Sequence, residues 1–159
     1  DIENAKNEKL AAELYKLAGV PTAEVKFTER DGKPSIASKI IKGDQIGKHL
    51  ESAGYQNWEY KGLQEHFPAD AWLANWDVIG LGLDNLQLDG DGKAMRVDAG
   101  GSLMYRAQGG KKAFGDTVPE LDSLLDPKIN PQSAAVFAGI TEADITASVA
   151  KIAKIPDHA

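Results

Sequence analysis

The stretch NWDVIGLGLDNLQLDGDGKAMRVDAGG, residues 75–101, carries three polar side chains of the kind that bind divalent metals. Asp77, Asn85 and Asp98 each lie beside hydrophobic sequence typical of a strand or a helix, and Ala-Gly-Gly follows the last of them. Glycine lets the backbone bend sharply and approach a ligand closely. The turn sequence DGDG at residues 89–92 separates two short apolar segments, which predicts a β-hairpin within the stretch.

Upstream, the pattern predicts a helix over residues 4–18, in which Leu10, Leu14 and Leu17 share one face that Ala11 and Ala18 extend. Gly19 and Pro21 are placed to end this helix.

In the sequence that follows, apolar and polar residues alternate from Ala23 to Phe27. Residues 30–33 are typical of a turn, and residues 35–41 are rich in β-branched side chains, so this segment is predicted to be a β-hairpin. A short helix is expected after Asp44. A buried helix beginning near Pro68 is expected to deliver Asp77 at its carboxyl end.

The last third is expected to be helical. Residues 117–120 match a capping box, and further helices are expected to begin at Asn130-Pro131 and at Thr141. In the final helix Ile145, Val149 and Ile152 form an apolar stripe. The order of helix, hairpin, helices, hairpin and helices predicts an α+β fold in a single domain.

Composition excludes several classes of protein. The 159 residues carry a net charge of −6 with no dense cluster of Lys or Arg, so nucleic acid is not expected as a partner. No apolar run approaches the length of a membrane span. Cysteine is absent, which excludes disulfides and thiolate zinc sites. Localisation stays open between the cytoplasm and a delivered effector or toxin.

Other metal and hydrolase chemistries have little support. The three histidines are dispersed, so a zinc site is not expected. The DGDG turn lacks two features of an EF-hand loop, the glycine at loop position six and the closing glutamate. Ser102 is not in a nucleophile-elbow sequence.

Phosphoryl transfer suits the three polar residues better. This reaction needs divalent metal on the nucleotide phosphates and a carboxylate that orients the attacking hydroxyl. Asn85 and Asp98 are expected to supply oxygens to the metal, and Asp77 to face the acceptor. In the alternative interpretation all three residues are ordinary turn or helix-end residues without a metal-binding or catalytic role.

On these motifs the chain resembles the atypical kinase group that includes HipA-like serine kinases and the phosphoinositide 3- and 4-kinases. The matching segments are Asn75-Trp76-Asp77, Asn85 and Asp98-Ala99-Gly100. The resemblance implies a protein-kinase-like fold. Residues 1–42 would then be the remnant of an incomplete amino-terminal lobe, and residues 43–159 a largely helical carboxy-terminal lobe with a catalytic hairpin.

The resemblance also implies nucleotide-binding roles near the amino terminus. Glu8 takes the position of the helix glutamate that pairs with the nucleotide-binding lysine, and Ser38, Ile40 and Ile41 lie near the expected hinge that contacts adenine. Arg106, Lys111 and Lys112 lie in segment 105–112, where a kinase keeps its activation or substrate segment, and they either meet phosphate or an acidic substrate or form a solvated loop.

Two features depart from the pattern of the group. Arg-His, which often follows the catalytic aspartate, is replaced by Val78-Ile79, and Lys6 is the sole lysine before Asn7. Most of an amino-terminal lobe is therefore missing from this sequence. A fragment of a longer protein, one half of a split enzyme and a degenerate kinase are the three explanations.

The expected function is ATP-dependent phosphotransfer with Mg²⁺ or Mn²⁺ to a hydroxyl acceptor, either a protein Ser or Thr or a small molecule or lipid. The alternative is a catalytically silent, kinase-derived binding module that acts through a protein partner. A third hypothesis keeps the fold and transfers a nucleotidyl group.

Overall fold

A computed structural model describes residues 2–52 and 60–158 of the chain. Its fold is mixed α+β, which confirms the predicted class, and the division into kinase-like lobes stays a prediction. The strands of the described residues form two separate antiparallel pairs. The elements are α1 (Ile2–Leu17), β1 (Val25–Arg30), β2 (Lys33–Ser38), α2 (Ile46–Ser52), the 3₁₀ turn η1 (Gln64–His66), α3 (Phe67–Trp72), β3 (Leu86–Leu88), β4 (Ala94–Arg96), α4 (Glu120–Ser123), α5 (Pro131–Phe137) and α6 (Glu142–Ile152).

The first helix, α1, ends as its sequence predicts, at Gly19 with φ +75°. The predicted face of the helix is buried only in part: Ala11 and Ala18 are buried, and Leu14 packs against their cluster. Leu10 and Leu17 are 52% and 51% exposed, whereas Tyr15 and several alanines of the same helix are buried. The small alanine side chains let α1 lie close to α3, where Ala69 and Leu73 complete the cluster.

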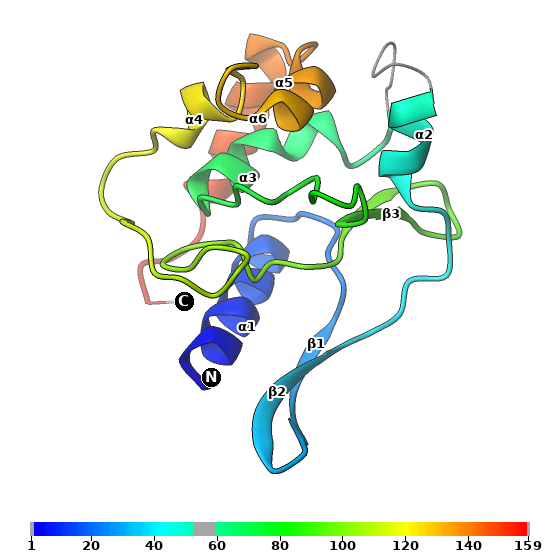
Figure 1. The fold of residues 1–159 in the computed structure, drawn as a ribbon. Coiled ribbons are helices and arrows are strands. Elements are labelled where there is room, and N and C mark those ends of the chain that lie inside the picture. The colour runs from blue at the N-terminus through cyan, green and yellow to red at the C-terminus, as the bar shows by residue number, and fades with distance from the viewer. Residues whose placement is uncertain (1, 53–59, 159) are drawn as a thin grey trace.

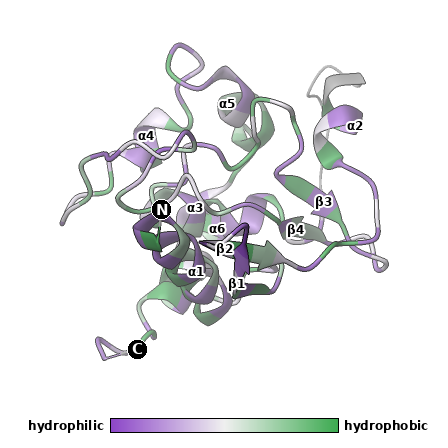
Figure 2. Cartoon of the chain, turned by 60° about the horizontal axis from the view of Figure 1, so that its bottom comes forward, coloured by the Kyte–Doolittle hydropathy of each residue, from purple (hydrophilic) through white to green (hydrophobic). Residues whose placement is uncertain are grey.

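The β1–β2 hairpin is confirmed, with Val25 opposite Ser38 and Arg30 opposite Lys33. Asp31 and Gly32 both have positive φ, as expected of a two-residue turn that matches the strand twist. The hairpin lies beside α1, its turn projects beyond the helix in Figure 1, and its strands are largely hydrophilic in Figure 2. Apart from Val25 its strand residues are not buried.

The second predicted hairpin, β3–β4, is also confirmed, with Leu86 opposite Arg96 and Leu88 opposite Ala94. A carboxylate oxygen of Asp89 accepts hydrogen bonds from the backbone N–H groups of Asp91 and Lys93, each at 2.9 Å. The turn therefore stabilises itself locally without a metal ion.

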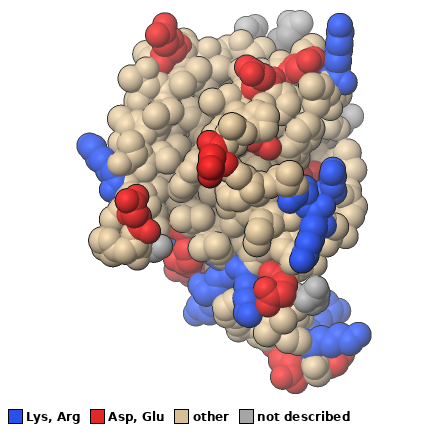
Figure 3. All heavy atoms as spheres, turned by 90° about the vertical axis from the view of Figure 1, so that its left-hand side faces the viewer, with Lys and Arg blue, Asp and Glu red and all other residues tan. Residues whose placement is uncertain are grey.

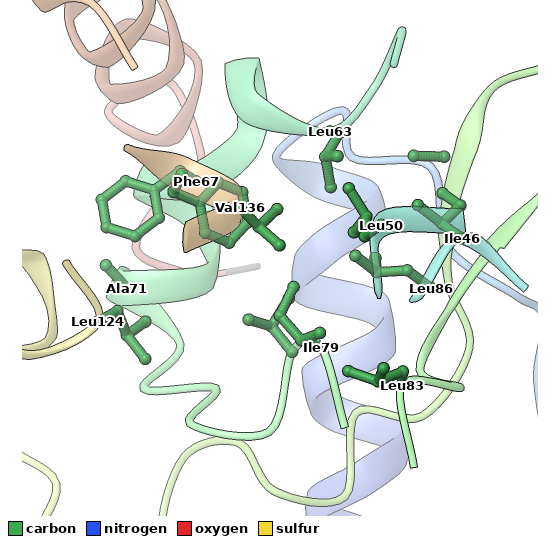
Figure 4. Close-up of a cluster of buried hydrophobic side chains, with 13 residues drawn as sticks. Ile46, Leu50, Leu63, Phe67, Ala71, Ile79, Leu83, Leu86, Leu124 and Val136 are labelled. Atoms are coloured by element: carbon green, nitrogen blue, oxygen red, sulfur yellow. The ribbon is translucent and has the colours of Figure 1, made fainter. Parts of the chain in front are cut away.

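The larger hydrophobic core joins α2, α3, β3 and α5. Figure 4 shows Phe67, Leu50, Leu86 and Val136 converging from these four elements. The aromatic rings of Phe67 and Phe137 pack with centroids 4.9 Å apart. This core fixes the loop between α3 and β3, which carries Asp77 and Asn85.

The carboxy-terminal helices follow their predicted caps in two cases out of three. Asn130 caps α5 by accepting from the N–H of Ser133. Thr141 and Asp144 form the capping box of α6. The capping box predicted at Thr117 is wrong, because Pro119 is the N-cap of α4 and no side-chain hydrogen bond caps that helix.

The predicted stripe on α6 is only partly buried. Val149 is 46% exposed, and Ile152 packs at the edge of the cluster around α1. None of the described helices is long and apolar enough to cross a membrane.

Candidate functional site

The three polar residues singled out in the sequence lie on segments that the β3–β4 hairpin holds together. Asp77 lies in the loop after α3, Asn85 directly precedes β3, and Asp98 follows β4 by two residues. The N–H of Val97 donates to the carbonyl oxygen of Asn85 over 3.1 Å, which continues the strand pairing up to the site. Strand register therefore fixes Asn85 beside the segment that carries Asp98.

Asn85 is bound directly to Asp77. Its side-chain Nδ2 donates to the backbone oxygen of Asp77 over 2.6 Å and to carboxylate Oδ2 over 3.1 Å. The amide oxygen Oδ1 of Asn85 accepts no hydrogen bond from the described residues, although the residue is only 9% exposed. The nitrogen of this amide is engaged, and its oxygen remains as an acceptor with no partner among the described residues.

The carboxylates of Glu8 and Asp98 both lie near Gly100. A Cβ atom placed on Gly100 would lie 3.2 Å from Asp98 Oδ1 and 3.7 Å from Glu8 Oε2. The N–H of Gly100 already donates to Asp98 Oδ1 over 2.9 Å. The absence of a side chain at Gly100 therefore allows two carboxylates to come near each other.

Burial and the charge of Asp98 both disfavour the charged form of Glu8. Burial raises the pKa of Glu8, and the charge of Asp98 raises it further. Burial also raises the pKa of Asp77; the hydrogen bond from Asn85 opposes this, and the charges of Asp98 and Asp84 add to it. A cation at this place would relieve the repulsion.

Asn7 positions the amino-terminal part of this site. It is buried, its Nδ2 donates to the carbonyl oxygen of Ser102 over 2.9 Å, and its Oδ1 accepts from the N–H of Met104 over 3.4 Å. Both bonds tie α1 to the segment that follows Asp98. This explains why Glu8, the next residue, faces Asp98.

The glutamate does not have the lysine partner that the kinase pattern implies. No ion pair involves Glu8 in the described part of the chain, and Lys6 pairs with Glu3 over 2.9 Å instead. The nucleotide-binding role of Glu8 therefore stays a prediction.

The residues predicted to contact adenine are not joined to the carboxylates by any hydrogen bond of the described chain. Ser38 ends β2 and lines a shallow hollow of about 380 Å³ together with Lys26 and Lys39. Ile40 is 85% exposed and Ile41 is half-buried. Their predicted role is left as a prediction.

No three His, Asp or Glu side chains in the described ranges come together as a metal-binding group. A site built from Asn85 and Asp98 alone is still chemically suitable for Mg²⁺, which is usually held by one or two protein oxygens together with water and substrate phosphates. The free Oδ1 of Asn85 and the exposed carboxylate of Asp98 are hard oxygen donors of that kind.

Lys112 has a role that the sequence does not reveal. Its Nζ donates to the carbonyl oxygen of Gly101 over 2.6 Å and to that of Ala74. Burial lowers the pKa of Lys112 to about 8. Lys112 is therefore bound to the backbone and does not lie in a fully solvated basic loop, whereas Arg106 and Lys111 are exposed.

A second unpredicted feature is a buried polar network beneath the site. Arg96 pairs with Asp70, Tyr15 donates to Asp70 over 2.8 Å, and Asn75 donates to the hydroxyl of Tyr15 over 2.9 Å. The network connects β4, α3 and α1 to the residue two positions before Asp77. Its members are far apart in the sequence, so no local pattern indicated it.

Comparison with known proteins gives no match to a family model, to a curated protein sequence or to a solved structure.

Proposed function

We propose that this chain is a kinase-type phosphotransfer unit that uses ATP as donor. Asn85 and Asp98 would hold Mg²⁺ or Mn²⁺, and Asp77 would orient a hydroxyl acceptor. The observation that carries the proposal is the paired arrangement of Asn85 and Asp77. The amide nitrogen of Asn85 is bound to Asp77, and its free oxygen is left for a metal ion.

The chemistry needs little from the protein beyond position and charge. As the acceptor oxygen bonds to the γ-phosphorus and the bond to the leaving ADP breaks, Asp77 takes the hydroxyl proton. Burial raises the pKa of the Asp77 carboxyl, which makes it a better proton acceptor than an ordinary aspartate. A metal ion, when bound, supplies positive charge against the phosphate oxygens.

The raised pKa of Glu8 supports the same proposal. Burial and the nearby charge of Asp98 disfavour the charged form of this half-buried carboxylate. Cationic charge at Asp98 would lower that pKa. Addition of Mg²⁺ with nucleotide should therefore stabilise this region.

The test compares three single variants in metal-dependent ATP binding and in phosphate transfer. Asp98→Asn should abolish Mg²⁺-dependent nucleotide binding, and Asp77→Asn should spare binding and remove transfer. Asp91→Asn changes an exposed carboxylate of the β3–β4 turn and serves as the control. Unchanged binding and transfer in both site variants would contradict the proposal.

The released product tests the type of transfer. ADP accompanies phosphoryl transfer, whereas pyrophosphate would accompany nucleotidyl transfer. Detection of pyrophosphate would move the proposal to the second reaction.

A binding module without catalysis is the second candidate, and the missing basic partner of Glu8 favours it. Thermal unfolding with ATP and Mg²⁺ separates the two. A dissociation constant near 10 μM with about 1 mM ligand should stabilise the fold by roughly 2.7 kcal/mol. Absence of any shift over a wide nucleotide range would favour the binding module.

A further inference from the structure

A hollow of about 460 Å³ opens beside Asp77, between the loop after α3 and the start of α5. The described residues that line it include Trp76, Asp77, Leu81, Ile129, Pro131 and Gln132. We name this hollow the Asp77 pocket. Its volume lies within the range of pockets that bind small molecules or a few side chains.

Hydrogen bonds hold the two walls of the Asp77 pocket in place. The side chain of Asn130 donates to the backbone oxygen of Trp76 over 3.0 Å, while its Oδ1 caps α5 at Ser133. The indole N–H of Trp76 donates to Glu120 over 3.3 Å. The pocket is therefore built before any ligand arrives.

Large apolar side chains on these walls face solvent. Trp76 is 39%, Leu81 78% and Ile129 51% exposed. Exposed apolar side chains that gather around a hollow are typical of a binding site, because covering them removes apolar surface from water.

The charge on the walls restricts what can bind. Asp77 is the only charged residue among the described residues that line the pocket, and Lys128, the neighbour of Ile129 in sequence, is not one of them. A phosphorylated headgroup would meet the carboxylate of Asp77 with no basic lining residue to offset its charge. An uncharged acceptor meets no such repulsion.

The side-chain amide of Gln132 adds a polar contact. It forms no hydrogen bond in the described part of the chain, and it offers both a donor and an acceptor. A backbone peptide group presents the complementary pair. A polypeptide suits the pocket because its backbone can meet Gln132 while its apolar side chains cover Leu81 and Ile129, whereas a sugar-like acceptor has no such side chains.

Figure 3 agrees with a mixed surface charge, because acidic and basic side chains are interspersed over the face it shows, with uncharged surface between them. No large field of one sign is seen on that face to attract a strongly charged partner.

We propose that the Asp77 pocket binds a Ser or Thr of an uncharged polypeptide segment in which a large apolar residue lies next to the hydroxyl residue. This proposal rests on the proposed phosphotransfer. The hydroxyl oxygen bonds to the γ-phosphorus of ATP, the bond from that phosphorus to ADP breaks, and the hydroxyl proton goes to the Asp77 carboxylate. The apolar neighbour packs against Leu81 and Ile129.

The experiment uses a fluorescent neutral peptide with one Ser between two Leu residues, and a matched peptide in which Glu replaces both Leu. Direct binding is measured by anisotropy, independently of ATP. The leucine peptide should bind about tenfold or more tightly than the glutamate peptide. Equal binding of the two peptides would overturn the proposal.

Variants locate the binding. Ile129→Glu and Leu81→Glu should each weaken binding of the leucine peptide by about tenfold. Val149→Glu, a similarly exposed apolar position on α6, should leave it unchanged. Circular dichroism checks that each variant folds. Binding that survives both pocket substitutions would also overturn the proposal.

Two further measurements keep the two proposals separate. ATP binding and Mg²⁺-dependent ATP hydrolysis with water as acceptor report on the phosphotransfer unit alone. Normal hydrolysis with no phosphate on the peptide, or phosphate on a short-chain phosphatidylinositol phosphate instead, would overturn the acceptor proposal and leave the proposed function intact. Peptide binding without any nucleotide binding would contradict the proposed function.

Discussion

Asp70 and Arg96 form an ion pair whose side chains are 0% and 1% exposed. Arg96 Nη2 lies 2.6 Å from Asp70 Oδ2, and Nε lies 3.1 Å from Oδ1, so the contact is bidentate. Two further N–H groups of the guanidinium donate to the carbonyl oxygens of Gly62 and Leu63. The pair joins α3 to β4 and lies beneath the segment that carries Asp98.

Asp70→Asn should therefore destabilise the fold strongly. The substitution leaves the charge of Arg96 buried and unpaired, for which the expected loss in the free energy of unfolding is about 3–5 kcal/mol. Urea unfolding measures it, with the exposed Asp122→Asn as control. A loss no larger than that of the control would show that the pair is not formed.

The double variant Asp70→Leu with Arg96→Met gives a second check. Because it removes both charges, it should cost less than Asp70→Asn alone.

Gly80 and Gly92 allow backbone strain to be separated from crowding of the site. Both have positive φ, +82° and +74°, so alanine is strained at either position, by roughly 1 kcal/mol. A Cβ on Gly80 would also lie 2.9 Å from Asp84 Oδ1 and 3.0 Å from Asn85 Cγ, whereas one on Gly92 meets nothing within 4 Å.

Gly80→Ala should thus lose more stability than Gly92→Ala and should also displace the side chain of Asn85. Urea unfolding gives the first comparison. The NMR chemical shift of the Asn85 side-chain amide gives the second, and it should move only in Gly80→Ala. Equal behaviour of the two variants would contradict the close packing of Gly80 against Asn85.

His66 should make the fold acid-sensitive. Burial, followed by the charges of Arg96, Lys151 and Lys93, lowers its pKa to about 3. Glu65 lies 3.6 Å from His66 Nε2 and would favour the charged form, but its side chain is 51% exposed and does not reverse the shift.

The direction of this pH dependence follows from the number of protons that the folded and the unfolded chain bind. Between the usual histidine pKa near 6.5 and the folded value of about 3, the unfolded chain binds the extra proton. Stability is therefore complete above about pH 6.5 and is lost as the pH falls through this window. His66→Leu should flatten the dependence measured by urea unfolding between about pH 4 and pH 7, and the exposed His158→Leu should not. A slope unchanged in His66→Leu would contradict this assignment.

The parts of the fold that the sequence predicted are those determined by nearby residues. The turn at Asp31-Gly32 and the cap of α5 at Asn130 depend on contacts within a few positions, and both are confirmed. The predicted face of α1 included Ala11 and Ala18, which are buried, but the pattern did not show that Leu10 and Leu17 would stay exposed, because that depends on what the rest of the fold brings against the helix.

In the candidate site, too, the features that depend on nearby residues could be predicted from the sequence, and those that depend on distant residues could not. Strand pairing of β3 with β4 could be predicted from one turn, and it brings Asn85 beside the segment of Asp98. The bonds of Lys112 to Ala74 and Gly101 span 38 and 11 positions. Such bonds join two loops without periodicity, so only the folded chain reveals them.

Lys112 should be the residue that holds the loop before Asp77 against the segment after Asp98. Lys112→Met keeps the length and loses both hydrogen bonds, so the buried carbonyls of Ala74 and Gly101 are left without this donor. The expected cost is about 1–3 kcal/mol for each group that finds no other partner. Lys111→Met, at the exposed neighbouring position, is the matched control and should cost less than about 0.5 kcal/mol.

The pH dependence of the free energy of unfolding separates the loss of the buried Lys112 amine from a general loss of packing. Because burial lowers the pKa of Lys112 to about 8, from 10.5, the unfolded chain binds more protons between these values. Wild-type stability should therefore gain a contribution as the pH rises through that window, and Lys112→Met should lack it while Lys111→Met retains it. Identical slopes in the two variants, measured by urea unfolding, would show that Lys112 is not held in the buried position.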